Sequence, residues 1–185
     1  MVGLFRRTPS SETICALYGA IVAQARQPVF YTAYGVPDSV AGRFDMIVLH
    51  AILVLRRLRG EGDGLRELGQ GVFDLFCHDL DHNLRERGVG DLAVPRQMRG
   101  LAEAFYGRAA AYDRALAQSG NGELAAALAR NVFAGSPPRG ADLLASYVRA
   151  AEVDLAGQAT ATLHRGVLQF PAPEAILGGE ATAGV

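Results

Sequence analysis

Two histidines four positions apart, His78 and His82, are the residues whose types and spacing could most directly do chemistry. On a helix this spacing lets two imidazoles reach one zinc ion, and Asp81 or Asp74 could add an oxygen ligand. The glutamate that follows the first histidine in zinc hydrolases is replaced by Asp79, and the other two histidines of the chain fall on other predicted helices. A metal-dependent hydrolase built on His78 and His82 therefore stays an alternative, but we expect no metal and no other cofactor.

No arrangement for nucleophilic catalysis stands out. Cys15 and Cys77 form no CxxC pair, and no serine lies in a Gly-x-Ser-x-Gly turn. We expect both cysteines to be buried free thiols. Gly88 and Gly90 stand where a helix must end, with no strand before them and no Lys-Ser or Lys-Thr pair after them. They predict a tight turn rather than a phosphate-binding loop, and we expect no catalytic residue.

A recognition surface is better supported than a reaction. All 18 cationic side chains are arginines, which form planar, bidentate contacts with carboxylates or phosphates. Arginine and tyrosine are also enriched at protein interfaces. On the helix predicted from about residue 65 to 87, the polar side chains share one face. The opposite face is an apolar stripe predicted to be core: Leu68, Val72, Phe73, Phe76, Leu80 and Leu84. The candidate partner-binding residues are Asp81, Arg85, Asp91, Tyr106 and Arg108.

Small residues form a second pattern, on the helix predicted over residues 95–116. Gly100, Ala104, Gly107 and Ala111 leave one flank almost bare, which admits close approach by another helix. That helix could be internal or belong to a partner, and we favour internal packing. The predicted core stripe of the same helix is a different one, made of Met98, Leu101, Ala102, Phe105, Ala109, Tyr112 and Leu116.

Helical periodicity runs through most of the chain, and no convincing alternating strand pattern appears. Residues 28–37 are predicted to be an aromatic-rich connector, and the segment from Pro171 onward a loose tail. We predict an all-α protein: a single compact domain of about six helices over residues 1–170, with a flexible tail over 171–185. The predicted helices run from Ser10 or Ser11 to about Arg26, from a cap at Asp38 to Leu58, from Leu65 to Arg87, from Pro95 to Leu116, from a cap at Asn121 to about Ala134, and from a cap at Asp142 toward His164.

Composition limits the classes of protein. With 185 residues, 50% of them hydrophobic and 20% charged, the chain is long enough for one globular domain with a real core. A net charge of -1 argues against DNA as a partner. The N-terminus lacks the pattern of a secretory signal, and the longest apolar run, over residues 46–55, is far shorter than the ~20 residues that span a bilayer. We expect a protein that is soluble or lies on a membrane surface.

Several segments occur in an order and spacing that are typical of one family. They are Tyr34-Gly-Val-Pro-Asp38, Gly42-Arg-Phe44, Leu53-Val-Leu-Arg-Arg-Leu58, residues 81–92 and Phe105-Tyr-Gly-Arg108. Through these segments, between about residues 31 and 116, the chain resembles the ubiquinol–cytochrome c chaperones. Members of that family assist assembly of the respiratory bc1 complex by handling newly made cytochrome b.

The resemblance implies a non-catalytic assembly chaperone whose partner is cytochrome b or another bc1 subunit. A second assembly factor, the ribosome and a membrane surface are further partners that it allows. The mitochondrial members have a targeting sequence that this chain lacks, so we expect a bacterial cytoplasmic protein, peripheral at the inner membrane. A helical module that binds a hydrophobic ligand such as quinone or lipid is the other alternative, because an apolar groove that shields a client could also accept such a ligand.

Overall fold

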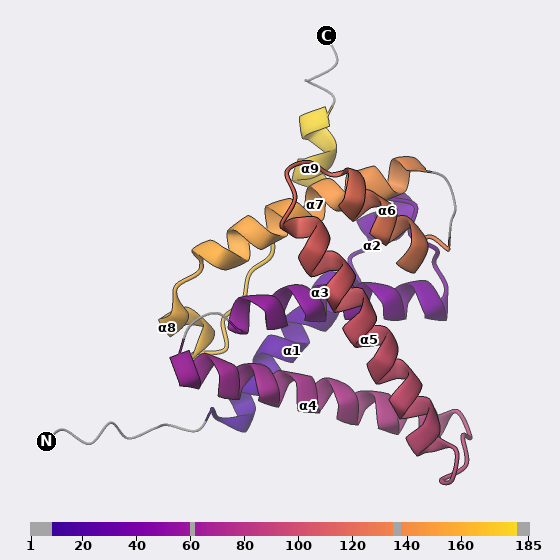
Figure 1. The fold of residues 1–185 in the computed structure, drawn as a ribbon. Helices are drawn as coiled ribbons and strands as arrows, with labels where there is room; N and C mark the ends of the chain where they lie inside the picture. The colour runs from indigo at the N-terminus through magenta and orange to yellow at the C-terminus, as the bar shows by residue number, and fades with distance from the viewer. Residues whose placement is uncertain (1–8, 60–61, 135–137, 181–185) are drawn as a thin grey trace, which may run out of the picture.

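The computed structural model describes residues 9–59, 62–134 and 138–180, and within these ranges every regular element is a helix. The predicted all-α class is confirmed (Figure 1). Short helices occur beyond the six that were predicted, one of them inside the expected connector over residues 28–37. The bounds are α1 (Ser11–Ala25), α2 (Pro28–Thr32), α3 (Val40–Leu58), α4 (Gly62–Glu86), α5 (Val94–Leu116), α6 (Gly122–Asn131), α7 (Pro138–Gly157), α8 (Thr160–Leu163) and α9 (Pro173–Glu180).

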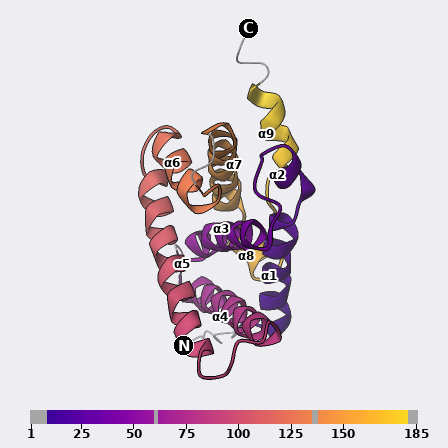
Figure 2. The same ribbon diagram turned by 90° about the vertical axis from the view of Figure 1, so that its right-hand side faces the viewer.

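Helix α3 is the centre of the fold. It packs against α1, α4 and α7, and Figures 1 and 2 show it in the middle of the molecule. Every residue from 48 to 55 is buried, which explains the long apolar run without a membrane. Val40, by contrast, stands at the first turn of α3 and is 61% exposed. No helix in the described ranges is both long and apolar enough to cross a membrane.

Helices α4 and α5 form a hairpin beside α3. They meet at a tip at the lower right of Figure 1, from which α5 rises diagonally across the molecule. Leu68 and Phe76 of α4 and Phe105 and Tyr112 of α5 are buried, as the apolar stripes predicted. The ring centroids of Phe76 and Phe105 lie 5.5 Å apart. Gly88 has φ +80°, so the predicted glycine stop after α4 is confirmed.

The predicted N-cap residues of α1 and α3 can be compared with the observed ones. The Ser10 hydroxyl accepts a hydrogen bond from the first turn of α1, as predicted. At α3 the predicted cap, Asp38, is wrong by one residue. The Ser39 hydroxyl accepts the hydrogen bond from the Gly42 N–H at 3.1 Å, whereas Asp38 pairs with Arg43 at 2.7 Å.

Two later boundaries also differ from the predictions. Asn121 precedes α6, but its side chain makes no capping hydrogen bond, because its amide oxygen accepts from Arg149 Nε at 2.8 Å. Helix α7 begins at Pro138 rather than at a cap on Asp142, and it ends at Gly157, before the short helix α8. A proline is favoured in the first turn of a helix, where its missing N–H is not needed.

The predicted loose tail is wrong for residues 171–180, where α9 packs on the domain. The Tyr34 hydroxyl donates to the Pro173 carbonyl oxygen at 2.8 Å. Pro173 is buried, and Ile176 and Leu177 pack against the core. The partners of this segment come from distant parts of the chain, so its own small-residue composition gave no sign of them. Residues 181–185 lie outside the described residues.

Candidate functional site

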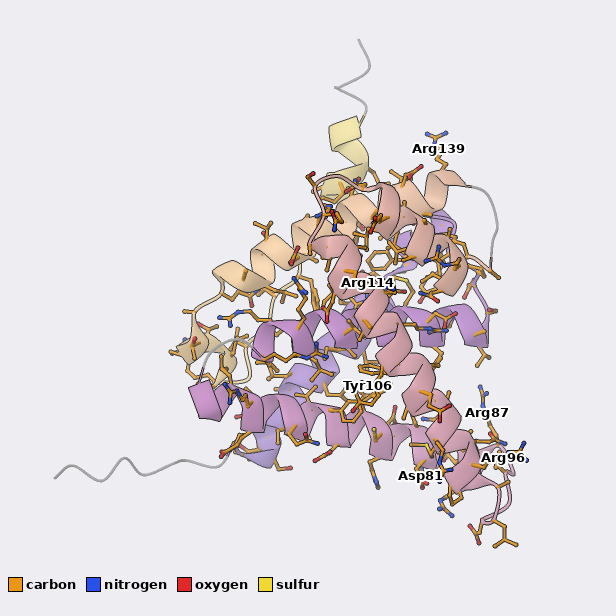
Figure 3. The ribbon with its side chains drawn as sticks, viewed as in Figure 1. Asp81, Arg87, Arg96, Tyr106, Arg114 and Arg139 are labelled. Atoms are coloured by element: carbon orange, nitrogen blue, oxygen red, sulfur yellow. The ribbon has the colours of Figure 1, made fainter. Side chains whose placement is uncertain are left out.

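The five candidate partner-binding residues lie in three separate places. Asp81, Arg85 and Asp91 form one cluster at the tip of the α4–α5 hairpin. Tyr106 stands at a groove farther along α5, and Figure 3 shows it well away from Asp81. Arg108 binds a carboxylate of α3. The structure therefore does not join them into one surface.

Arg85 closes the hairpin tip by binding two carboxylates. Its Nε donates to Asp81 Oδ2 at 2.6 Å, and its Nη1 donates to Asp91 in the loop. The guanidinium lowers the pKa of Asp81, and the same hydrogen bond raises the pKa of Arg85. The side chains of Asp81, Arg85 and Asp91 are 36%, 46% and 86% exposed. The cluster braces the loop while it still faces solvent, so its net effect on stability is small.

Arg108 is directed into the protein. Its Nη1 donates to Asp45 Oδ1 at 2.6 Å, and the two side chains are only 22% and 15% exposed. Burial raises the pKa of Asp45 even though Arg108 lowers it, so desolvation outweighs the ion pair. This geometry favours a structural role for Arg108, tying α5 to α3.

Tyr106 forms one wall of an apolar groove between α3, α4 and α5. The residue is 56% exposed, and its ring centroid lies 5.9 Å from that of Phe73 and 5.8 Å from that of Phe105. Phe73 was predicted as core but is only partly buried, because it faces this groove. The groove has a volume of about 200 Å³ and is lined by Leu55, Leu58, Arg59, Arg66, Gly69, Gln70, Phe73, Phe105 and Tyr106. We call it the Tyr106 groove.

A glycine and an ion-pair network shape the Tyr106 groove. A Cβ at Gly69 would lie 3.2 Å from Leu58 Cβ, so a larger residue there would push α4 away from α3. At the rim, Arg59 donates to Asp113 at 3.1 Å. Arg56 joins Asp113 at 2.6 Å and Glu152 at 2.9 Å. Sequence reasoning missed this network, because it connects three helices that are distant in the chain.

Arg56, Arg57 and Arg59 form a short basic run at the end of α3, where a contact with the ribosome would be conceivable. Arg56 and Arg59 are committed to the network just described, and Arg57 donates to the carbonyl oxygens of Leu155 at 2.8 Å and Gln158 at 2.9 Å. These contacts hold α3 against α5 and α7. The run therefore serves packing within the domain, and its geometry gives no support to a ribosomal contact.

The small-residue flank of α5 is open, so the prediction of internal packing is wrong. Gly100, Ala104 and Gly107 are exposed, and no atom lies within 4 Å of where a Cβ would stand at either glycine. Where the flank reaches α6 it meets a second groove of about 550 Å³, lined by Ala111, Arg114, Ala115, Ala117, Gln118, Glu123, Ala126, Ala127 and Arg130.

His78 and His82, the candidate metal ligands, are exposed on α4. His82 Nε2 lies 3.1 Å from Glu86 Oε1. Asp79 accepts a hydrogen bond from the Tyr18 hydroxyl at 2.8 Å and so braces α4 against α1. Within the described residues, no three His, Cys, Asp or Glu side chains are grouped as a metal site.

The two cysteines are free, but the prediction that both are buried is wrong. Cys15 is exposed and Cys77 is partly buried. Burial, with a smaller effect of Asp74, raises the pKa of the Cys77 thiol. A raised pKa lowers the fraction of reactive thiolate, which is the opposite of what a nucleophile needs.

Comparison with known proteins identifies the family of this chain. Open apolar grooves on a helical domain are typical of a protein that binds other proteins. Residues 32–170 match the family model described as ubiquinol-cytochrome C chaperone. This chain therefore belongs to the ubiquinol–cytochrome c chaperone family, whose members assist assembly of ubiquinol–cytochrome c reductase.

Individual relatives support the same family assignment. A Xenopus laevis protein named ubiquinol-cytochrome-c reductase complex assembly factor 1 is 27% identical over 135 residues, which cover 72% of this chain and 67% of that protein. Proteins of the same name from Mus musculus and Homo sapiens are 27% identical over 135 residues, but the chain spans only 45% of their length. A crystal structure of the Cbp3 homolog from Brucella abortus superposes with a TM-score of 0.84 at 38% identity, covering 92% of this chain and 96% of that one.

Proposed function

We propose that this chain is a non-catalytic chaperone that binds newly made cytochrome b during assembly of ubiquinol–cytochrome c reductase. The observation that carries the proposal is the family match, which extends over residues 32–170. The Brucella abortus structure supports it, since its likeness covers nearly the whole described fold. That cytochrome b is the client follows from the resemblance of the sequence motifs.

The Tyr106 groove is the surface that we assign to the client. Phe73, Phe105 and Tyr106 present aromatic walls, and aromatic side chains dominate the energetics of protein interfaces. Arg59 at the rim is paired with Asp113 but is 52% exposed, and the remaining N–H groups of its guanidinium can donate to an acidic group of the client. A membrane-protein helix outside the bilayer exposes apolar side chains that promote aggregation. A groove that covers some of them holds the client without any chemical step.

A small hydrophobic ligand is the alternative occupant. The Tyr106 groove, at about 200 Å³, is below the range of roughly 300–1,000 Å³ that encloses a typical ligand. The α5–α6 groove is larger, at about 550 Å³. Native mass spectrometry of the untreated protein distinguishes the two proposals, because a retained quinone or lipid would favour the ligand-binding module.

Capture of cytochrome b from detergent-solubilised membranes tests the assignment of the groove. Tyr106→Asp places a charge on the groove wall, and it should reduce capture by roughly ten-fold or more, as expected for a central aromatic anchor. Val153→Asp is the matched control, since Val153 is a 69% exposed apolar residue on α7. Equal capture by the two variants would show that the client binds elsewhere. Failure of the unmodified protein to capture cytochrome b would reject the proposed client itself.

A further inference from the structure

The tip of the α4–α5 hairpin presents Leu92, which is 98% exposed and the most exposed large apolar side chain in the described residues. A single exposed apolar residue is common and means little by itself. Leu92 differs in its location, because it lies in the loop that joins α4 to α5. Figures 1 and 2 both show this loop at an extremity of the molecule, beyond the other helices.

Three exposed arginines surround this loop. Arg87 directly follows α4, and Arg96 and Arg99 lie in the first turns of α5. Figure 3 shows Arg87 and Arg96 at this end of the hairpin. None of their three side chains has a hydrogen-bond or ion-pair partner in the part of the chain that the structure describes. Their guanidinium groups are therefore available to an external anion.

The acidic groups of the tip are already engaged. Asp81 and Asp91 bind Arg85, and Glu86 lies beside His82. Residues 85–99 contain four arginines and two acids, which gives this segment a formal net charge of +2, whereas the whole chain carries -1. The positive charge at the tip thus stands out against a slightly acidic protein.

We propose that the hairpin tip, residues 87–99, docks this protein on an anionic lipid surface. Leu92 enters the boundary between headgroups and acyl chains, while the three arginines contact lipid phosphates. An apolar group flanked by basic residues is the combination that holds peripheral proteins on anionic bilayers. A protein partner would require a pocket for Leu92 and acids matched to each arginine, whereas a fluid lipid surface adapts to a protruding tip. This surface is distinct from the Tyr106 groove and does not depend on the proposed client.

The sequence permits a direct test, because it contains no tryptophan. Leu92→Trp creates a single indole at the tip, and Val153→Trp creates one at a 69% exposed control site on α7. Each protein is mixed with phosphatidylcholine vesicles with and without phosphatidylglycerol. We expect the emission of Leu92→Trp to shift to shorter wavelength, and to be quenched by brominated acyl chains, only on the anionic vesicles. Absence of that shift, or an equal shift for Val153→Trp, would overturn the proposal.

Sedimentation with the same vesicles tests the arginines in the otherwise unmodified chain. Replacing Arg87, Arg96 and Arg99 together by glutamine should weaken binding to anionic vesicles by roughly 100-fold at low ionic strength. The control, Arg114→Gln with Arg139→Gln, removes exposed arginines away from the tip and should change binding by less than about two-fold. Binding that survives the triple replacement would contradict the assignment. Because no cytochrome b is present, either result leaves the proposed client to its own test.

Discussion

At the scale of single residues, the ion pair of Arg108 with Asp45 determines how a functional test on Arg108 must be read. Arg108→Ala leaves a mostly buried carboxylate without its partner, and it should cost about 2–3 kcal/mol of unfolding free energy. The exposed Arg85 is the control, and Arg85→Ala should cost much less, because its ion pairs face solvent. Urea denaturation of both variants checks this. Equal, small losses would show that the pair with Asp45 does not tie α5 to α3.

The pH dependence of Arg108→Ala has a definite sign. Without Arg108 the pKa of Asp45, already raised by burial, should rise further. A carboxyl group whose pKa is raised in the folded state favours folding at low pH, and this advantage is lost as pH rises through that pKa. The destabilisation by Arg108→Ala should therefore be larger at neutral pH than in acid. A loss that does not vary with pH would contradict this.

His50 should make the fold sensitive to acid. It is fully buried, its Nδ1 donates to the Met46 carbonyl oxygen at 2.8 Å, and its Nε2 accepts from the Tyr147 hydroxyl at 3.0 Å. Burial lowers its pKa from 6.5 to about 4. The unfolded state therefore binds a proton first, and roughly 3 kcal/mol of stability should be lost as pH falls from about 6.5 to about 4.

Denaturation of His50→Gln across the same pH range measures this contribution. The variant should start less stable at neutral pH but lose less stability on acidification than the unmodified protein. His164→Gln, at an exposed position, is the control and should keep the original pH profile. An unchanged profile for His50→Gln would mean that other groups cause the acid sensitivity.

At the scale of elements, two helical glycines that look alike in sequence should respond oppositely to alanine. A Cβ at Gly42 would lie 2.0 Å from the Pro37 carbonyl oxygen, whereas nothing lies within 4 Å of one at Gly100. Gly42→Ala should therefore destabilise the start of α3 by about 1–3 kcal/mol. Gly100→Ala should stabilise α5 by about 0.5–1 kcal/mol. Thermal melts compare them, and changes of the same sign would contradict the close approach at Gly42.

The contact that holds α9 can be tested through one hydroxyl. Tyr34→Phe removes the donor to the Pro173 carbonyl oxygen, and it should cost about 1 kcal/mol, or more if the carbonyl is left unpaired. Tyr106→Phe removes a hydroxyl from an exposed ring and should change the melt very little. Hydrogen exchange of residues 173–180 should rise only in Tyr34→Phe. Unchanged exchange would show that α9 is held by its apolar contacts alone.

The long helices could be predicted from the sequence because each has an apolar stripe that repeats with the helical period, such as Leu68, Val72 and Phe76. The short helices could not, because α2, α8 and α9 are stabilised by partners elsewhere in the fold. The small-residue flank of α5 could be recognised in the sequence, but its exposure could not be predicted. Small residues at Gly100 and Gly107 permit a close neighbour, but the sequence does not say whether one is present.

At the scale of the whole molecule, the candidate surfaces were only partly predictable. Tyr106 was identified from its motif, and the structure places it on a groove. Arg85 and Arg108 came from equally suggestive motifs, yet each is bound to carboxylates of the same chain. The arrangement of charges across helices decides which arginines are available, and that arrangement depends on tertiary contacts that no local pattern contains.

The two proposed surfaces of the molecule lie at different places on one hairpin. The Tyr106 groove is formed partway along α5, whereas the tip lies where α4 and α5 meet (Figure 3). Docking through the tip would leave the groove open beside the membrane, where the proposed client is inserted. Variants of one surface should therefore leave the other function intact: Tyr106→Asp should keep vesicle binding, and replacing Arg87, Arg96 and Arg99 by glutamine should keep capture of cytochrome b in detergent.

The central claim is that this protein serves assembly of ubiquinol–cytochrome c reductase. The most direct measurement is the amount of assembled complex, by native electrophoresis of membranes, in a strain that lacks the gene and in the same strain with the gene restored. We predict that the deletion lowers the assembled complex severalfold while the cytochrome b transcript stays near normal, and that the restored gene recovers it. Full levels of assembled complex in the deletion strain under several growth conditions would contradict the account.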